Sequence, residues 1–432
     1  MIKSQLCKIV SMIFLLSSCG QAKSGAIAQP LSFATDTVEY VVLGQPTKGE
    51  IIINDTINLC NRKCILPEGI TLSFKGGLIR NGTLVGNKTK LNSSKACFER
   101  VRISGTWNVI TIRSSLFLDL SYDNALKDVV ALSDSTVNNR IVIEEGDYQV
   151  TANKNGDVCI PIASNTDLII NGTIRLKPND YRNYYIIQAN GNNITMRGRG
   201  SIIGDKHVHT GRSGEWGMGI NLDNAHNVMI KGLTIKDCWG DCIYVGNESS
   251  DVRIENCLLD HGRRQGVSIT SANGVTIKNC TITNVCGTAP EYAIDVEPNK
   301  DDTVDNVIIE RVLAKDCMGG FLVYGRAPNA HVGKVTLRNC TVEYNKMLAI
   351  SVQKCDVLKV EKCHVRQKPV QRVMSFEDIG NVTVINNSYH NDEGALGKIL
   401  WRVRRANDND ATYTPVAVNG CKKTRFENNR EK

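Results

Sequence analysis

Short stretches in which apolar and polar residues alternate recur along the second half of the chain. Each consists of a few alternating positions, a polar turn and a second short alternating run. The repeats are VMIKGLTIKDC (228–238), VRIENCLLDHG (252–262), VTIKNCTITNV (275–285), VIIERVLAKDC (307–317), VTLRNCTVEYN (335–345) and LKVEKCHVRQK (358–368). The valines Val252, Val275, Val307 and Val335 follow one another at intervals of 23, 32 and 28 residues. A period of two predicts β-strands, and repeats of this length predict the coils of a parallel β-solenoid.

The same pattern argues against two other architectures. A helical fold would need apolar residues at a spacing of 3.6, which no coil keeps. An antiparallel sandwich would need recurrent tight hairpins, and Asn-Gly and Asp-Gly turns do not recur at a suitable spacing. We therefore predict an all-β chain.

The cysteines follow the coils. Sixteen cysteines would suggest disulfides in an exported protein. However, Cys257, Cys280, Cys340 and Cys363 occupy equivalent points of successive repeats. Cysteine is small and is readily buried as a free thiol. We predict a stacked interior ladder instead of disulfide pairs.

A second alignment places polar chemistry on one face. The triplets INL, IYV, VSI, IDV, FLV and ISV, each inward–outward–inward, begin at Ile220, Ile243, Val267, Ile294, Phe321 and Ile350. Because neighbouring strands lie about 4.8 Å apart, equivalent positions form columns along the stack. The columns bring together Asp241, Arg264, Gln265, Tyr292, Asp295, Glu297 and Tyr324. We expect these to line one groove about 15 Å long. Glycines such as Gly240 and Gly266 are expected to keep its wall low for a ligand.

Two carboxylates of this set share one strand. In YAIDVEPN (292–299), Asp295 and Glu297 lie two residues apart, which is about 7 Å along a strand. Carboxyl groups separated by roughly 6.5–9.5 Å suit inverting glycoside hydrolysis, in which one protonates the leaving oxygen and the other activates water. Asp241 is an alternative partner, so the three are the candidate catalytic residues. The simpler interpretation is an exposed face of ion pairs, such as Arg264 with Glu291, which would add little stability.

The segment GDKHVHTGRSGEWGMGI (204–220) is longer than a coil turn requires. Loops on a rigid scaffold often carry function, so we expect substrate contacts here. The candidates are His209, Glu215 and Trp216, of which Trp216 can stack on a sugar ring. Arg263 is expected either to join them at the edge of the groove, as an anion contact, or simply to be solvated.

Composition and charge narrow the partners. The chain has 432 residues, of which 41% are apolar and 22% charged, with a formal net charge of +8. These values are typical of a globular protein. No block of Lys and Arg interleaved with aromatic residues is present, so no nucleic-acid partner is predicted. His207 and His209 form an H-x-H pair without an evident third ligand, so no metal site is predicted.

The N-terminus reads as a processing segment. MIKSQLCKIVSMIFLLSSCG combines two lysines, an apolar run and small residues before Cys19. Leu16-Ser17-Ser18-Cys19 resembles the bacterial lipobox, in which the cysteine is lipidated after cleavage. We expect residues 1–19 to be a lipoprotein signal peptide and Cys19 to be the membrane anchor. Gly20 favours sorting to the outer membrane in such proteins, on either its periplasmic or its cell-surface side.

Further segments carry a resemblance to a fold family. ILPEGITLSFKGGLIRNGTLVG (65–86) resembles the first coils of right-handed parallel β-helix proteins, and the likeness extends over roughly residues 50–395. It implies a single-stranded right-handed parallel β-helix at 49–395, preceded by a linker and N-terminal cap at 20–48. Residues 396–432 would form a C-terminal cap and tail. Such proteins occur as monomers and as trimers, and the sequence does not separate these states.

The resemblance also bears on function. NVMIKGLTIKDCWGDCIYVG (227–246) resembles polygalacturonase-type β-helix hydrolases, and Asp241 matches their first aspartate. The family's paired aspartates fall on Arg264 and Gln265, and its histidine falls on Tyr292, so this mechanism is carried no further than Asp241. The set EWGMGI, WGDCIYVG, RRQGVSI and IDVEPN resembles phage tail-spike and secreted bacterial proteins of the pectate-lyase superfamily. This resemblance implies action on, or binding to, a polysaccharide.

Three functions remain open from the sequence. The first is a secreted, lipid-anchored glycoside hydrolase that needs no cofactor. The second is a calcium-dependent lyase of a uronate polymer, with carboxylates holding Ca²⁺ and Arg263 or Arg264 serving the substrate. The third is a glycan-binding solenoid without catalysis.

Overall fold

The computed structural model describes residues 37–367, 373–391 and 416–431. The predicted signal peptide, its Cys19, and the linker up to residue 36 lie outside the described residues, as do residues 392–415 of the predicted C-terminal region.

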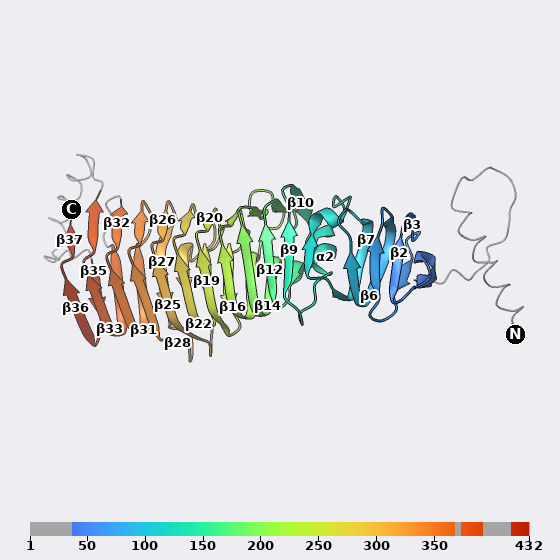
Figure 1. Ribbon diagram of the computed structural model, residues 1–432. Helices are drawn as coiled ribbons and strands as arrows, with labels where there is room; N and C mark the ends of the chain where they lie inside the picture. Colours follow the sequence, from blue (N-terminus) through green and yellow to red (C-terminus); the bar gives the residue numbers. More distant parts are fainter. Residues whose placement is uncertain (1–36, 368–372, 392–415, 432) are drawn as a thin grey trace, which may run out of the picture. The chain divides into compact units, whose positions relative to one another are not determined.

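Three parallel sheets make up the described part of the chain (Figure 1). The first has seven strands, β1 (Thr37–Val38), β2 (Glu50–Ile53), β3 (Thr56–Asn58), β4 (Lys63–Ile65), β5 (Thr71–Phe74), β6 (Leu78–Asn92) and β7 (Phe98–Asn108). The second has eleven, β10 (Asp147–Val150), β13 (Thr173–Leu176), β15 (Ser201–Ile203), β17 (Thr234–Lys236), β20 (Leu258–Asp260), β23 (Thr281–Thr283), β26 (Leu313–Lys315), β30 (Thr341–Glu343), β32 (His364–Gln367), β34 (Ser388–Asn391) and β37 (Arg430–Glu431). The third has nineteen, β8 (Thr111–Arg113), β9 (Asn139–Ile143), β11 (Asp157–Ile162), β12 (Thr166–Ile170), β14 (Asn183–Gly198), β16 (Trp216–Lys231), β18 (Ile243–Gly246), β19 (Ser249–Glu255), β21 (Val267–Ile269), β22 (Ala272–Lys278), β24 (Tyr292–Val296), β25 (Thr303–Glu310), β27 (Gly319–Tyr324), β28 (His331–Val332), β29 (Lys334–Arg338), β31 (Ile350–Glu361), β33 (Met374–Ile385), β35 (Val416–Asn419) and β36 (Lys423–Glu427).

The pairing confirms the predicted parallel β-helix. Each strand pairs in parallel with the equivalent strand of the next coil, as in β18 with β21 and β21 with β24. The register matches the alignment of the triplets residue by residue, since Ile243 pairs with Val267 and Val267 with Ile294. The second repeat set is also in register, because Val252 pairs with Val275 and Val275 with Val307. Alternating apolar positions therefore stack into a continuous interior.

The interior is built from β-branched residues and the cysteine ladder. Inward residues such as Ile277 and Ile282 are fully buried. Cys257, Cys280, Cys340 and Cys363 are buried free thiols, as predicted. Each thiol donates to the carbonyl oxygen two residues earlier, for example that of Cys280 to Lys278 at 3.4 Å.

Short helical segments interrupt the β-strands, although the sequence predicts an all-β chain. A short helix, α2 (Ala125–Val130), contacts β7 and β11 and lies between the first sheet and the other two (Figure 1). At six residues it is too short to give a periodic signal. The 3₁₀ turns η2 (Tyr40–Leu43) and η3 (Ser114–Leu116) are shorter still, at four and three residues.

Parallel pairing extends beyond the predicted limits of the solenoid. Strand β1 pairs with β4 upstream of residue 49, and β35, β36 and β37 pair with β33 and β34 inside the predicted cap and tail. Strand β36 is exposed along its whole length. The change of composition in the C-terminal segment therefore reflects exposed strands that still pair with their neighbours.

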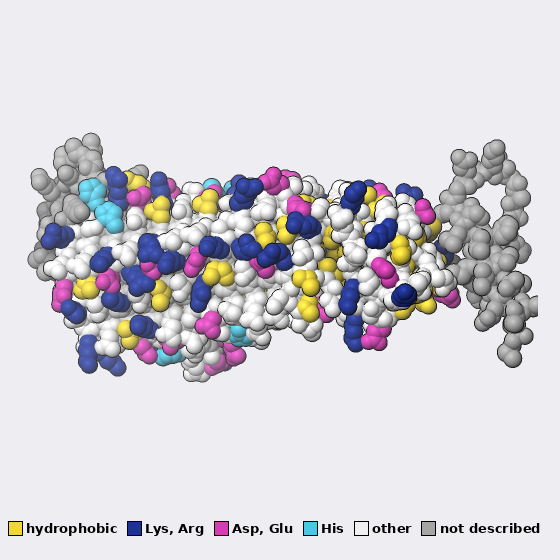
Figure 2. All heavy atoms as spheres, viewed as in Figure 1, with side chains coloured by type: hydrophobic (Ala, Val, Ile, Leu, Met, Phe, Trp, Pro, Cys, Tyr) yellow, Lys and Arg dark blue, Asp and Glu magenta, His cyan; other side chains and the backbone are white. Residues whose placement is uncertain are grey.

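The described part of the chain has no helix that could span a membrane, and one face carries both signs of charge. In the described ranges, no helix is long and apolar enough to cross a bilayer. On the face shown in Figure 2, Lys and Arg side chains are interspersed with Asp and Glu.

The ladder makes a testable statement about thiol reactivity. Cys286 is exposed, whereas burial raises the pKa of the Cys317 thiol to about 12. Because the thiolate is the reactive species, a thiol reagent should modify Cys286 rapidly and the ladder thiols only after denaturation. Cys286→Ser should abolish the fast phase and Cys317→Ser should leave it unchanged. If denaturation without a reductant released no further thiols, the ladder would be disulfide-bonded and the prediction wrong.

Candidate functional site

Three successive coils contribute to one group of polar side chains, here called the carboxyl cluster and consisting of Asp241, Arg264, Gln265, Ser268, Asp295 and Glu297. Asp241 lies two residues before β18, Arg264 and Gln265 precede β21, and Asp295 lies in β24. Ser268 is opposite Asp295 in the strand register. The turns are held together by backbone bonds, since the Arg264 N–H donates to Gly240 O at 3.2 Å. The parallel stack thus places these residues side by side, as the column alignment predicts.

Asp241 is completely buried. The Ser268 hydroxyl donates to its Oδ2 at 2.8 Å, and the Arg264 guanidinium lies 3.4 Å from the same oxygen. Burial raises the pKa of Asp241 to about 6, although Arg264 and Ser268 act in the opposite direction. Within the described residues its Oδ1 has no hydrogen-bond partner.

Asp295 is also buried, at 1% exposure, and is held by an amide. The Gln265 Nε2–H donates to Asp295 Oδ2 at 2.8 Å, while Gln265 Oε1 accepts the Tyr292 backbone N–H at 2.8 Å. Burial first, and then the neighbouring charge of Glu297, raise the pKa of Asp295 well above its usual range. Its Oδ1 likewise lacks a hydrogen bond from any described residue.

Arg264 supplies the positive charge among these acids. Its side chain is 17% exposed and its Nε lies 3.5 Å from Oε2 of Glu215. Burial disfavours the charged guanidinium, but Asp241, Asp295, Glu297 and Glu215 outweigh it and raise the pKa of Arg264. The suggested Arg264–Glu291 pair is replaced by these contacts, because Glu291 instead accepts the backbone N–H of Gly287.

Tyr292 and the glycines serve packing. The Tyr292 ring is 7% exposed and lies against Gly319, where an added Cβ would be 2.4 Å from ring atoms. A Cβ at Gly240 would lie 2.4 Å from the carbonyl oxygen of Glu215, and one at Gly266 would lie 2.5 Å from that of Ala293. Gly240 and Gly266 therefore permit close approach of adjacent coils.

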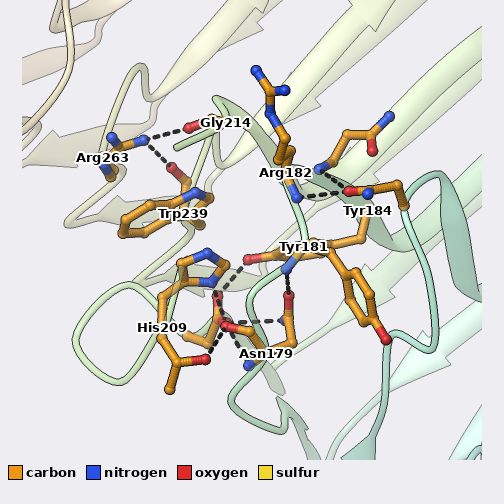
Figure 3. A network of polar contacts seen from close by, with 12 residues as sticks. Asn179, Tyr181, Arg182, Tyr184, His209, Gly214, Trp239 and Arg263 are labelled. Carbon is orange, nitrogen blue, oxygen red and sulfur yellow. Dashed lines mark hydrogen bonds and ion pairs between the residues drawn. The ribbon is translucent and has the colours of Figure 1, made fainter. Parts of the chain in front are cut away.

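A second network lies in the loop before β16 and includes His209 and Arg263 (Figure 3). The Arg263 guanidinium stacks on one face of Trp239 at 3.8 Å from the ring centroid. His209 stacks on Trp239, with ring centroids 3.8 Å apart. His209 Nδ1 lies 2.8 Å from Asp205 Oδ2, and Arg263 donates to Gly214 O at 2.8 Å.

This network fastens the loop and buries the His209 side chain completely, whereas Arg263 keeps part of its surface exposed. Tyr184 and Asn179 complete it, both donating to Asp205. Asp205 and Trp239 were not singled out from the sequence, since only the path of the loop brings them together. The sequence offered one indication for Trp239, which lies two residues before the candidate catalytic residue Asp241.

The remaining predicted contacts lie at the borders of the cluster. Trp216 is 47% exposed at the start of β16, beside Glu215. Tyr324 is half-buried at the end of β27, one coil beyond Glu297. Both are accessible to a ligand, in contrast to His209.

Metal coordination has little support in the carboxyl cluster. Among the residues that the structure describes, no three His, Cys, Asp or Glu side chains are arranged to hold an ion. The carboxyls face the Arg264 guanidinium and the Gln265 amide instead. The donor set therefore does not fit Ca²⁺, and no step is derived through it.

The pKa of Asp241 predicts how stability depends on pH. The unfolded carboxyl ionises near 3.8 and the folded one near 6, so between these values the folded chain retains a proton that the unfolded chain has lost. The free energy of unfolding should fall as pH rises through this window, by up to about 3 kcal/mol, and stay low above it. Asp241→Asn should flatten this slope in urea unfolding at pH 4 to 7.

The pH dependence of the free energy of unfolding is the quantity to compare, and not its absolute value. Loss of the contact between residue 241 and Arg264 changes stability at every pH above the folded pKa of Asp241, whether or not that carboxyl titrates abnormally. Asp55→Asn, at an exposed position, is the matched control and should leave the slope unchanged. An unaltered slope in Asp241→Asn would show that this carboxyl titrates normally.

Comparisons with known proteins agree with this architecture. Residues 148–302 match the family model described as right handed beta helix region. The chain is 30% identical over 164 residues to the SPbeta prophage-derived uncharacterized protein YorA of Bacillus subtilis (strain 168), covering 32% of this chain and 28% of that protein. It is 30% identical over 192 residues to the uncharacterized protein YclG of the same organism, covering 37% and 32%. The matches thus span about a third or less of each relative's length.

Solved structures resemble the chain at low sequence identity. The tailspike protein of E. coli bacteriophage HK620, a double mutant in which an Asp and a Glu are replaced by Ala, in complex with pentasaccharide, is similar at a TM-score of 0.51 and 13% identity. The likeness covers 75% of this chain and 64% of the tailspike chain. The Family 28 exopolygalacturonase of Yersinia enterocolitica gives a TM-score of 0.47 at 11% identity, covering 74% and 78%. The stacked parallel coils, together with the family match over residues 148–302, show that the chain has the right-handed parallel β-helix fold.

Proposed function

We propose that the protein is a polysaccharide-degrading enzyme, a glycoside hydrolase whose reaction depends on the carboxyl cluster. One observation carries the proposal, namely a buried carboxyl, Asp295, whose pKa is raised well above its usual range beside the half-exposed carboxylate of Glu297. A buried carboxyl with a raised pKa that lies next to a second carboxyl group is typical of acid–base sites in enzymes.

The proposed roles follow from protonation. Asp295, whose raised pKa favours the protonated form, donates its proton to the glycosidic oxygen as the bond from that oxygen to the anomeric carbon breaks. Glu297 accepts a proton from water, whose oxygen bonds to the anomeric carbon. Asp241, with a pKa of about 6, is the alternative base and provides negative charge near the oxocarbenium-like transition state.

Access to Asp295 requires side-chain movement. Arg264 joins the buried Asp241 to Glu215 at the loop, and its long side chain can rotate without disturbing the backbone stack. Trp216 and Tyr324, on either side of the cluster, are the proposed sugar contacts. The side-chain amide of Gln265 is hydrogen-bonded to Asp295 and to the Tyr292 backbone. We therefore assign it the role of orienting Asp295 and not of contacting substrate.

The comparison with the HK620 tailspike supports a polysaccharide ligand, since that protein was solved with a pentasaccharide. At 13% identity this likeness concerns the fold, so the substrate is argued from the site. A glycan-binding protein without catalysis is the second candidate, favoured by the near-complete burial of Asp241 and Asp295.

We also propose that the protein is anchored to a membrane. The lipobox-like sequence at Cys19 supports an outer-membrane lipoprotein, on the periplasmic or the cell-surface side. The solenoid would then act on polysaccharide near that membrane as a monomer or a trimer.

Substitution of the acid pair tests the chemistry. On a panel of neutral and acidic polysaccharides, the parent chain should release reducing ends, and chelator should not change the rate. Asp295→Asn and Glu297→Gln should each lower kcat by about 10²- to 10⁴-fold while glycan binding persists. Asp55→Asn is the control and should keep full activity.

Other outcomes would identify the alternatives. Unsaturated, ultraviolet-absorbing products that disappear in chelator would indicate a lyase. Saturable glycan binding without any product from the parent chain would indicate a binding protein, and the hydrolase proposal would fail.

Trp216 provides an independent test of where the substrate lies. Trp216→Ala should weaken glycan binding by about 1–3 kcal/mol because a stacking surface is lost, with a smaller effect on kcat. Leu258→Ala, at a residue that is 41% exposed but belongs to another sheet, is the matched control. Equal binding by the Trp216 variant and the parent would move the proposed sugar contact elsewhere.

A further inference from the structure

Two carboxylate–imidazole pairs meet on the surface beside the carboxyl cluster. In the first, His207 Nε2 lies 3.1 Å from Oδ1 of Asp237, the residue that follows β17. In the second, His261 Nδ1 lies 2.8 Å from Oδ2 of Asp260, the last residue of β20. The two imidazole rings are in contact, with centroids 5.7 Å apart and planes at 68°.

The pairing could not be read from the sequence, where His207 belongs to an H-x-H motif. The structure separates that motif. His209 turns inward to Asp205, whereas His207 lies over the next coil and meets His261, which is 54 residues later in the chain.

Both histidines are held in place by the backbone. The Lys206 N–H donates to Asp237 O at 2.8 Å, and the His261 N–H donates to Thr283 O at 3.0 Å. Asp260 is fixed by the Thr283 hydroxyl at 2.6 Å and the Asn284 amide at 2.8 Å. The imidazoles are therefore presented on a supported surface, at 61% and 38% side-chain exposure.

We propose that His207 and His261 together bind a divalent transition-metal ion, with Asp237 and Asp260 orienting them. Imidazoles that ligate such ions usually donate their other ring N–H to a carboxylate, as both do here. The nitrogens left for the metal are His207 Nδ1 and His261 Nε2.

The ring separation fits this arrangement. A zinc–nitrogen bond of about 2.0–2.1 Å places two imidazole centroids on a tetrahedral ion about 5 Å apart, close to the observed separation. Two protein ligands leave positions for water, so this is a weaker site than a three- or four-ligand structural site. It is consistent with the absence of any three-residue metal group among the described residues.

A bound ion would tie two functional segments together. His207 belongs to the loop that carries His209 and Glu215, and His261 to the turn that carries Arg263 and Arg264. The ion would reinforce on the outer surface the attachment that the stacked His209, Trp239 and Arg263 provide inside. The inference rests on this geometry and is independent of the proposed hydrolase activity.

Calorimetric titration of the full chain with Zn²⁺, without an affinity tag, tests the site. The Cys286→Ser background is used because the exposed Cys286 thiol lies 3.9 Å from Lys206 Nζ, near the site, and can bind zinc itself. We expect saturable one-to-one binding and a raised thermal midpoint. His207→Ala and His261→Ala should each weaken binding more than about tenfold, and Asp260→Asn by about 10- to 100-fold.

The control is His331→Ala, because His331 also pairs with a carboxylate, Asp356 at 3.5 Å, but was not found beside a second imidazole among the described rings. Its removal should leave the affinity unchanged. No binding in the Cys286→Ser background, or equal loss in all three histidine variants, would overturn the proposal. His207→Gln replaces the alanine variant if the latter does not fold.

Discussion

Parallel hydrogen bonding of each coil to the next determines where every side chain of this protein can lie. Because the register repeats from coil to coil, residues separated by 23 to 32 positions in the sequence become neighbours about 4.8 Å apart. The arrangement brings the apolar positions into one interior and the polar positions into outer columns. Tyr244, Ser268 and Asp295 form such a column, and the carboxyl cluster is built around it.

The cluster places opposing demands on stability and chemistry. Two buried carboxyls are costly when ionised, and their raised pKa values express that cost. Arg264 compensates part of it, through contacts with Asp241 and with Glu215 of the long loop. A carboxyl that remains protonated near neutral pH is also what a general acid requires. The energetic cost of these carboxyls and their proposed catalytic function therefore both result from burial.

The columns could be predicted from the sequence because inward Ile and Val positions identify each coil without knowledge of its turns. This was enough to bring Asp241, Arg264, Gln265 and Asp295 together. The orientation of individual side chains could not be predicted in this way. Whether Tyr292 stands in solvent or packs on Gly319, and whether Arg264 reaches Glu291 or Glu215, depends on side-chain packing and on the path of residues 204–215. A long loop carries no periodic signal, so its contacts with Trp239 and with His261 emerged only from the structure.

Two consecutive arginines show how this loop and the cluster are connected. Arg263 turns to Trp239 and the carbonyl oxygen of Gly214, while Arg264 turns to the carboxyls and Glu215. A shift of the loop would change the position of Glu215 relative to Arg264, and with it the charge that compensates Asp241 and Asp295. The pKa values of the buried acids are therefore linked to the docking of a surface segment some distance along the chain. In a solenoid, where each coil contacts mainly its neighbours, such a loop is one of the few elements that can couple several coils at once.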